Sequence, residues 1–472
     1  MSEFVWMTAV ELAGLIRRGE VSATEVLQAH LDQIEALNPQ VNAIVTYLPE
    51  MALELAKRAD AKQARGDDLG VLHGLPIAHK DAFETKGIRT TWGSPVFSDH
   101  VPEADDLIIA RLKAAGCITL GKTNVPEFGA GSQTFNRVFG ATRNPHDLSR
   151  TCGGSSGGAA AALATGMIPI ADGSDLGGSL RNPASFCNVV GFRPTPGRVP
   201  NVPASNAWET LGVSGPMGRT VQDVALMLQA IAGYDARAPI SLQDPPSLFA
   251  NNLERDFGGA KLAYSADLDG LPVAPSVTDT IEKELGAFVD LGCSIERAQP
   301  DFRDAYEIFQ TLRAWSFEQS FADYFAEFGE EQFKDAIRWN VEQGRRLSGA
   351  QISRAEAKRS ELFQRVREFL TEYDFLLLPT TQVPPFSIEW EYPTQINDVA
   401  METYIDWMMS CAYITLTGLP AISVPCGFTE DGLPIGLQIV GGPHSDFAVL
   451  QLAYAFQETT RFFRRKPPIC NM

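Results

Sequence analysis

Two segments rich in glycine and serine hold the residues best able to perform covalent chemistry. Residues 152–158 read CGGSSGG and contain Ser155 and Ser156, and residues 173–185 read GSDLGGSLRNPAS and contain Ser179. Glycine lets the main chain approach a ligand closely, and a serine hydroxyl becomes a nucleophile when a neighbouring base removes its proton. Either segment alone is more often a tight turn with solvated serines. Two such loops flanking one predicted helix–strand unit instead indicate a shared site.

A histidine is not a convincing base for these serines. Residues 153–157, GGSSG, match the G-x-S-x-G nucleophile elbow, whose partner is a histidine farther along the chain. Of the six histidines, only His444 follows His146. A Ser-His-Asp enzyme would depend on His444 alone, so we do not favour this interpretation.

A second pattern suggests nucleotide binding and is also misleading. Residues 116–123, GCITLGKT, match G-x-x-x-x-G-K-[ST] letter for letter. A phosphate-binding loop requires a strand before it and a helix after it. Here a helical segment, residues 105–115, precedes the pattern, its variable residues are typical of a strand, and Pro126 follows closely. A nucleotide site is therefore not expected.

Several long motifs, in the right order along the chain, resemble the amidase signature family. GGSSGG and GSDLGGSLRNPAS resemble its two serine loops, and LHGLPIAHKD, which contains Lys80, resembles its lysine segment. GKTNVPEFGAGS, TRNPHD, GLPAISVPCGF and DGLPIGLQIVG match the family as well. The resemblance covers both ends of the chain and lapses only over about residues 235–370.

This resemblance implies a serine hydrolase in which Ser179 attacks the carbonyl carbon, Ser155 relays the proton and Lys80 receives it. Lys80 acts as a base only when neutral, and it follows directly after the apolar run of residues 75–78. Burial there would lower its pKa, because desolvation disfavours the charged form. A Ser-Lys pair is then the natural variant of the triad. His79 should point away, since adjacent side chains of a strand face opposite ways.

The resemblance also assigns supporting roles and a cis peptide bond just before Ser155. The oxyanion hole is expected from the main-chain N–H groups of Leu176, Gly177, Gly178 and Ser179. Leu176 departs from the threonine common in the family, with little consequence because only its backbone would act. The residues expected to brace the loops are Asp175, Arg181 and Ser156. The residues expected to line the substrate pocket are Gly129, Ala130 and Gly131.

The expected fold is a single α/β domain, residues 1–472, with a mixed, twisted central β-sheet covered by α-helices on both faces. Its regions are N-terminal helices (1–66), a core with the catalytic loops (67–233), a variable helical region (234–372) and strands and a helix that complete the core (373–472). Capping boxes at Thr8 and Ser22 predict two of the first helices, with ends at Gly19 and at Asn38–Pro39.

Eleven aromatic residues within residues 301–340 recur at spacings of three and four, so most should face the interior of helices. Residues 375–378, 421–424 and 435–440 are typical of buried strands. The Pro- and Asp-rich residues 235–278 form the best candidate for an internal boundary.

Composition excludes several other functions. The net charge of -19 argues against nucleic-acid binding, which needs clustered Lys and Arg. No apolar run is long enough to span a bilayer, and the N-terminus does not resemble a signal peptide. The seven cysteines form no C-x-x-C pair, which favours reduced thiols in a cytoplasmic protein. No metal ion or organic cofactor is implied, and homo-oligomer formation is left open.

The partner expected from the resemblance is a small-molecule amide, anilide or carbamate, with esters also within the range of the family. The aromatic-rich residues 301–340 favour an apolar or aryl substrate. The alternative is the glutamine-hydrolysing A subunit of a tRNA-dependent amidotransferase, for which Arg345 or Arg346 could bind the carboxylate of glutamine. A non-enzymatic binding module is disfavoured because all three catalytic positions are filled.

Overall fold

The N-terminal part of the chain forms three α-helices and one short strand, and two of the helices begin at the predicted capping signals, in a computed structural model that describes residues 2–268 and 270–471. Both predicted capping boxes are present, one at Thr8 and one at Ser22. Gly19, with a φ of 70°, follows the first helix as expected. The three helices are α1 (Ala9–Arg17), α2 (Ala23–Val41) and α3 (Pro49–Ala64).

The predicted end of the second helix at Asn38–Pro39 is wrong. The helix continues through the proline and ends at Asn42, whose φ of 57° is left-handed. A proline so close to the end of a helix disturbs few of its hydrogen bonds. The Asn38 side chain accepts hydrogen bonds from the N–H groups of Ala43 and Ile44, at 2.9 Å each, and so fastens the helix end to the strand that follows.

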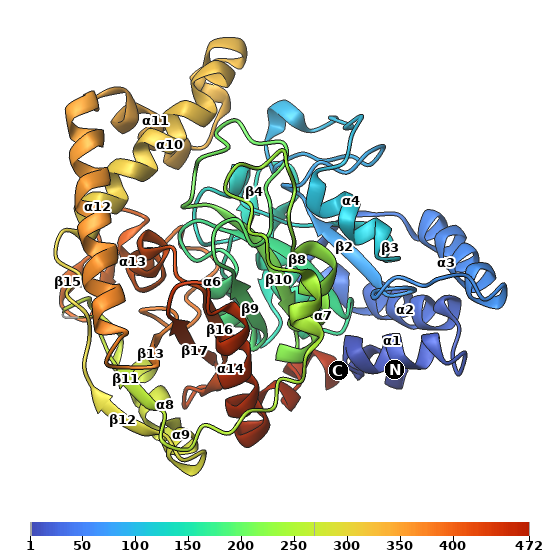
Figure 1. Ribbon diagram of the computed structural model, residues 1–472. Helices are drawn as coiled ribbons and strands as arrows, with labels where there is room; N and C mark the ends of the chain where they lie inside the picture. The colour runs from blue at the N-terminus through green and yellow to red at the C-terminus, as the bar shows by residue number, and fades with distance from the viewer. Residues whose placement is uncertain (1, 269, 472) are drawn as a thin grey trace.

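A mixed sheet of eight strands forms the centre of the fold (Figure 1). In spatial order its strands are β12 (Ser294–Arg297), β11 (Lys261–Tyr264), β13 (Phe375–Pro379), β17 (Pro434–Gly441), β16 (Ala421–Phe428), β9 (Val190–Arg193), β10 (Val213–Gly218) and β8 (Ile170–Asp175). β11 pairs in parallel with both of its neighbours, and all other pairs are antiparallel.

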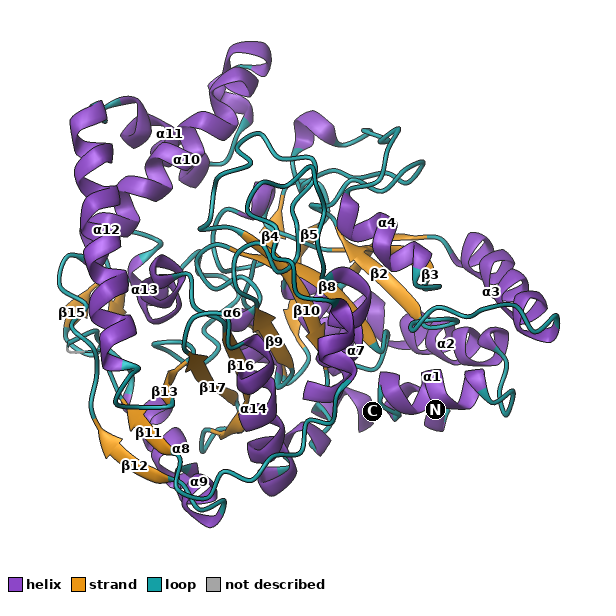
Figure 2. Ribbon diagram, viewed as in Figure 1, coloured by secondary structure: helices purple, strands orange, loops and turns teal. Residues whose placement is uncertain are grey.

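Both faces are buried over the middle of this sheet, which explains the nearly continuous apolar runs of β13, β16 and β17. In β13, Phe375 and Leu377 belong to one hydrophobic cluster, whereas Leu376 and Leu378 belong to another. Successive side chains of a strand point to opposite faces, so the two clusters lie on the two sides of the sheet. Helices cover both sides (Figure 2), which confirms the predicted fold class.

Several helices surround this sheet and a smaller, three-stranded sheet beside it. They are α4 (Leu107–Ala114), α5 (Gly157–Ala164), α6 (Arg181–Cys187), α7 (Val221–Ile231), α8 (Pro275–Glu284), α9 (Gly286–Asp290), α13 (Met409–Thr417) and α14 (Asp446–Thr460). Short two-stranded ladders occupy the loops. They are β4 (Phe135–Asn136) with β5 (Gly140–Ala141), β6 (Arg143–Asn144) with β7 (Asp147–Thr151), and β14 (Gln395–Ile396) with β15 (Val399–Ala400).

A smaller sheet lies next to the edge strand β8. Its strands are, in order, β1 (Ile44–Tyr47), β3 (Ile118–Thr123) and β2 (Pro76–Lys80). The Asp172 side chain on β8 accepts a hydrogen bond of 2.7 Å from the main-chain N–H of Lys80 on β2. The end of β2 is thereby fixed against the middle of β8, and the second serine loop follows the end of that strand at Asp175.

Three long helices stand apart from the sheet, at the upper left of Figure 1. They are α10 (Ala305–Phe328), α11 (Asp335–Arg345) and α12 (Gly349–Phe369). Most of the eleven aromatic side chains of residues 301–340 were predicted to face the interior. Six of the eleven are buried, which confirms this prediction. The six are Phe302, Phe309, Phe317, Phe321, Phe325 and Phe333.

Within the ranges given above, the protein has no helix that combines the length and the apolar character needed to cross a bilayer. Region 234–372 is not separate from the rest, because its strands β11 and β12 join the same sheet as β13 and β17.

Gly158, near the start of α5, tolerates no side chain. A Cβ there would lie 2.4 Å from the main-chain nitrogen of Asn124 and 2.7 Å from the carbonyl oxygen of Ala43. Gly158→Ala should therefore lower the free energy of unfolding by about 1–3 kcal/mol through overpacking. Gly349→Ala is the matched control, because nothing lies within 4 Å of its added Cβ. Equal free energies of unfolding for the two variants, measured by denaturant unfolding, would contradict this account.

Candidate active site

Lys80, the last residue of β2, has a fully buried side chain. Its Nζ lies 2.8 Å from Ser155 Oγ, 2.9 Å from Ser156 Oγ and 2.9 Å from Ser174 Oγ. Burial lowers the pKa of Lys80 from its usual 10.5 to about 7, although the nearby carboxylates oppose this change. Near neutral pH the amine is therefore available in its uncharged form, in contact with three hydroxyl groups.

His79, the residue before Lys80, contacts other groups. Its Nδ1 lies 2.5 Å from Asp172 Oδ2 and its Nε2 lies 3.0 Å from Thr119 Oγ1. Asp172 therefore holds the imidazole with one oxygen and the Lys80 N–H with the other. His79 makes no hydrogen bond to any of the three serines within the described ranges, in agreement with its predicted orientation.

The first serine loop places its hydroxyl groups at the start of α5. The peptide bond between Gly154 and Ser155 is cis, as the resemblance implies. Ser132 donates a hydrogen bond of 2.8 Å to the Gly154 carbonyl and so fixes this turn. The main-chain N–H of Ser156 donates to the Ser179 carbonyl at 3.2 Å. The two serine loops are thus joined directly through their backbones.

The second serine loop connects β8 with α6 and is organised by the buried carboxylate of Asp175. This carboxylate accepts hydrogen bonds from the N–H groups of Gly178 (3.0 Å) and Leu180 (3.2 Å) and from two nitrogens of Arg181. Burial alone would raise the pKa of Asp175, but Arg181 and then Arg193 hold it well below its usual range. Asp175 therefore stays ionised and fixes the loop.

Arg181 links the same loop to the C-terminal part of the core. Its Nη1 donates to Gln438 Oε1 at 2.5 Å and to the Cys411 carbonyl at 3.1 Å, and its Nη2 donates to Thr415 Oγ1 at 3.0 Å. The ion pair with Asp175 is 2.8 Å long, with both side chains fully buried. A buried, fully hydrogen-bonded pair of this kind holds its surroundings in one arrangement.

Four main-chain N–H groups of this loop were expected to form an oxyanion hole, and one of them is already engaged. Gly178 donates to Asp175, and its φ of 111° is a conformation that favours glycine. In the part of the chain that the structure describes, the N–H groups of Leu176, Gly177 and Ser179 donate to no protein atom. These three remain available to a ligand.

A cavity of about 360 Å³ opens over the serine loops. Ser155, Ser174 and Ser179 line it together with Leu176, and Ser179 is partly exposed. The apolar wall consists of Phe83, Phe128, Phe317 and Pro203. The charged side chains in the lining include Asp106, Glu209 and Arg313. The cavity therefore joins three serine hydroxyl groups to a mixed aromatic and charged surface.

The loop of Gly129, Ala130 and Gly131 reaches this cavity at only one point. Gly129 is among the lining residues, and a Cβ on it would lie 3.3 Å from Ser155 Oγ. Ala130 is buried in the hydrophobic cluster of the α10–α11 aromatic residues. A Cβ on Gly131 would face Lys334 Nζ at 3.5 Å. Of the three, Gly129 has the position expected of a pocket residue.

The two rival patterns do not form the sites that they suggest. Residues 118–123 of the phosphate-loop pattern are the strand β3, α4 precedes it, and only a short 3-10 helix, Glu127–Gly129, follows in place of an α-helix. Lys122 is buried and donates to the Phe83 carbonyl at 2.6 Å and to the hydroxyl groups of Thr85 and Thr90. This lysine therefore fastens the loop that follows β2 instead of facing a phosphate.

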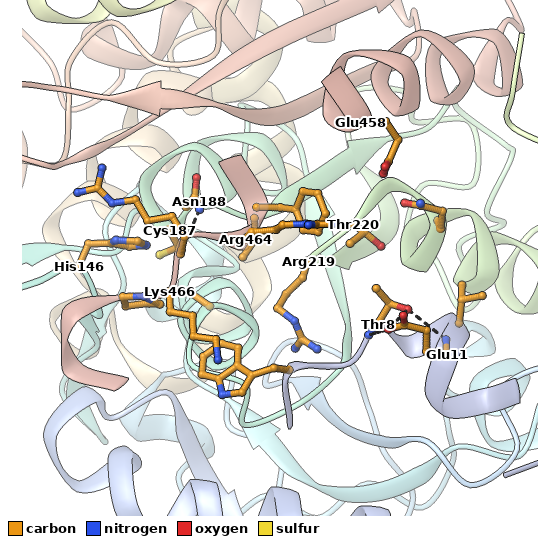
Figure 3. A pocket seen from close by; sticks show the side chains of 18 residues that line it. Thr8, Glu11, His146, Cys187, Asn188, Arg219, Thr220, Glu458, Arg464 and Lys466 are labelled. Carbon is orange, nitrogen blue, oxygen red and sulfur yellow. Dashed lines mark hydrogen bonds between the residues drawn. The ribbon is translucent and has the colours of Figure 1, made fainter. Parts of the chain in front are cut away.

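The histidines needed for a nucleophile elbow lie elsewhere. His444 lines a separate groove with Arg359 and Thr417. His146 lines a second cavity of about 530 Å³, between the N-terminal segment, the start of α7 and the C-terminal tail (Figure 3). None of the predicted site residues lines that cavity. Ser155 has Lys80, and no histidine, as its hydrogen-bond partner among the described residues.

Sequence reasoning did not assign three residues of this site. Ser174 is the third hydroxyl on Lys80, and Asp172 holds the main chain of the same lysine. Both are in or next to the recognised GSDLGGS motif, so the position of the motif was the available signal. Arg313 lines the cavity from α10, where the resemblance lapses, and no sequence signal marked it.

Comparisons with known proteins identify the family of this chain. The sequence profile of the family described as amidase matches residues 25–450. An acylamidase of Rhodococcus erythropolis is 34% identical over 466 residues, which cover 98% of this chain and 97% of that protein. The A subunit of the glutamyl-tRNA(Gln) amidotransferase of Moorella thermoacetica is 36% identical over 490 residues, with 99% of each chain covered.

Among solved structures, a bacterial aryl acylamidase of the amidase signature enzymes is similar with a TM-score of 0.92. It is 29% identical in sequence, and the match covers 98% of each chain. The family profile spans most of the chain, and the curated relatives match it from end to end. This chain belongs to the amidase signature family, whose members are hydrolases that act on the carbon–nitrogen bond of amides.

Proposed function

We propose that this chain is a stand-alone hydrolase that cleaves amides, anilides or carbamates through an acyl-enzyme on Ser179. The observation that carries the proposal is the buried Lys80 Nζ, 2.8 Å from Ser155 Oγ. A lysine with a pKa of about 7 serves as a general base near neutral pH. The partly exposed Ser179, across the same cavity, is the hydroxyl that a substrate can reach.

In this mechanism Ser179 Oγ attacks the carbonyl carbon and passes its proton to Ser155, which passes its own proton to Lys80. The tetrahedral intermediate carries a negatively charged oxygen, which the N–H groups of Leu176, Gly177 and Ser179 stabilise. Collapse of the intermediate expels the amine, which regains a proton through Ser155. Water then hydrolyses the acyl-enzyme by the same route in reverse. A carbamate follows the same path; hydrolysis of its acyl-enzyme releases an alkyl or aryl hydrogen carbonate, which decomposes to an alcohol that keeps the extra oxygen and to carbon dioxide that contains the carbonyl carbon.

The aromatic wall of the cavity supports an aryl or otherwise apolar substrate. Phe83, Phe128 and Phe317 line it, and the rings of Phe128 and Phe321 lie 4.9 Å apart in an edge-on contact. Aromatic surfaces of this kind bind flat apolar groups through dispersion and quadrupole interactions. The 0.92 TM-score with an aryl acylamidase points to the same substrate class.

A second candidate function is the glutamine-hydrolysing component of a tRNA-dependent amidotransferase, which the 36% identity to such a protein favours. The two arginines considered for binding the carboxylate of glutamine do not support it. Arg345 pairs with Glu330 at 2.5 Å, and Arg346 pairs with Glu342. Neither arginine lines the cavity over the serine loops.

The first test is hydrolysis of a p-nitroanilide, an aryl carbamate and glutamine by the natural enzyme and by Ser179→Ala. Loss of the nucleophile should lower turnover by about 10⁴-fold or more. Ser149→Ala, an exposed serine on β7, is the control and should retain activity. Full activity of Ser179→Ala would refute the mechanism. Turnover of glutamine alone would favour the amidotransferase function.

The pH dependence tests Lys80 as the base. Protonated Lys80 accepts no proton, so kcat/KM for an anilide should fall about tenfold per pH unit below pH 7 and level off above it. Lys80→Arg keeps a cation that does not lose its proton, so this variant should be inactive over the whole range. A flat profile between about pH 5 and 9 for the natural enzyme would exclude a lysine base with this pKa.

A further inference from the structure

Arg313 is a buried cation in the wall of the cavity that holds the serines. It lies on α10, and only 4% of its surface is exposed. It lines the same cavity as Ser155 and Ser179. A buried charge is costly unless an opposite charge or a full set of hydrogen bonds compensates it. The partners of this side chain therefore indicate what the cavity is built to receive.

The guanidinium of Arg313 has only one hydrogen-bond acceptor among the residues that the structure describes. Tyr404 Oη accepts from its Nε at 3.2 Å and from its Nη2 at 2.5 Å. The same oxygen also accepts from Asn340 Nδ2 at 2.5 Å. Across residues 2–268 and 270–471, Arg313 forms no ion pair and its Nη1 donates to no protein atom. A guanidinium carries five N–H donors, so most of them are left for a ligand.

Two aromatic rings hold the plane of this guanidinium. Its central carbon lies 4.4 Å from the centre of the Phe317 ring and 5.4 Å from that of Tyr404. Cation–π contacts favour the charge without using its N–H donors. Because Phe317 also lines the cavity, an aromatic surface and a preorganised fork of donors stand side by side.

Three acidic residues line the cavity and each is engaged elsewhere, Asp175 in its ion pair with Arg181. The Glu209 carboxylate accepts from the main-chain N–H groups of Leu211 (2.5 Å) and Gly212 (2.9 Å). Asp106 accepts from the N–H of Glu84 at 2.9 Å, and burial raises the pKa of Asp106 to about 6. Their negative charges repel an anion from the rest of the cavity. Apart from the main-chain N–H groups that face the reacting carbonyl oxygen, the favourable place for a ligand anion is at Arg313.

We propose that Arg313 binds a carboxylate of the substrate, so that the enzyme prefers amides and anilides that carry a carboxylate away from the bond that is cleaved. A carboxylate matches the planar fork of a guanidinium with two parallel hydrogen bonds. The aryl part of such a substrate packs against Phe317 and Phe128. This inference rests on the proposed function, since it assigns the substrate of that same site.

The test compares substrates of equal shape that differ in charge. One pair is 4-acetamidobenzoate and 4-acetamidobenzamide, with the carboxylate on the amine side. The other pair is succinanilate and its terminal amide, with the carboxylate on the acyl side. For at least one pair, kcat/KM should be about 10- to 100-fold higher for the carboxylate, mainly through a lower KM. Equal rates within both pairs would overturn the inference.

Variants at Arg313 assign this preference to its charge. Arg313→Gln should reduce the ratio of kcat/KM for the carboxylate substrate to kcat/KM for its amide counterpart to about one. Arg313→Lys should restore part of this ratio. Arg345→Gln, which removes an exposed arginine outside the cavity, should leave the ratio unchanged. If Arg313→Gln lowers kcat/KM equally for both substrates of a pair and leaves the midpoint of thermal unfolding unchanged, Arg313 has a purely structural role.

Two further arms separate this inference from the proposed function. Acetanilide, which has no carboxylate, reports the amidase reaction alone. If neither acetanilide nor any member of the two pairs is hydrolysed, the proposed function itself fails. If acetanilide is hydrolysed and the carboxylates give no advantage, only the role of Arg313 fails. Glutamine distinguishes the carboxylate of an amino acid from that of an aryl acid, and a preference for glutamine would overturn the aryl assignment.

Discussion

The removal of the Lys80 amine from water is the constraint on which the rest of the site depends. The unfolded chain binds a proton on this lysine up to about pH 10.5, whereas the folded chain holds it only up to about pH 7. Between these values the unfolded state binds more protons than the folded state. Lys80 therefore lowers the free energy of unfolding at neutral pH, and this penalty disappears as the pH rises from about 7 to 10.5. The fold therefore sustains a destabilising residue whose neutral form the three serines surround.

Two carboxylates on β8 make that arrangement possible. Asp172 accepts the N–H of Lys80 and contacts His79, so it fixes the end of one sheet against the edge of the other. Asp175, at the end of the same strand, is paired with Arg181 and organises the loop that carries Ser179. One edge strand thus positions both Lys80 and the loop of Ser179, through buried carboxylates that accept hydrogen bonds from main-chain N–H groups.

The parts of this picture that are local in sequence could be predicted, and those that depend on distant segments could not. The serine loops, the strand before Lys80 and the capped helices follow from patterns of a few residues. Pro39 led to a wrong prediction of the helix end, because a proline close to the end of a helix disturbs few of its hydrogen bonds and does not stop it. The role of Arg313 could not be predicted, because it depends on a hydrogen bond to Tyr404 and on a cavity formed by segments far apart in the chain.

The way in which α10–α12 join the central sheet bears on how such an enzyme diversifies. The chain leaves this sheet after β12 and returns at β13, and only β11 separates these two strands. Both strands lie at the end of the sheet away from β8, so insertions of very different length can be exchanged between them without moving the serine loops or β2. An exchange of this kind replaces Arg313 and Phe317 together, but Tyr404 lies outside the exchanged segment. Such an exchange therefore separates the arginine from the tyrosine oxygen that holds it, and the position of the Tyr404 hydroxyl limits which new side chains fit there.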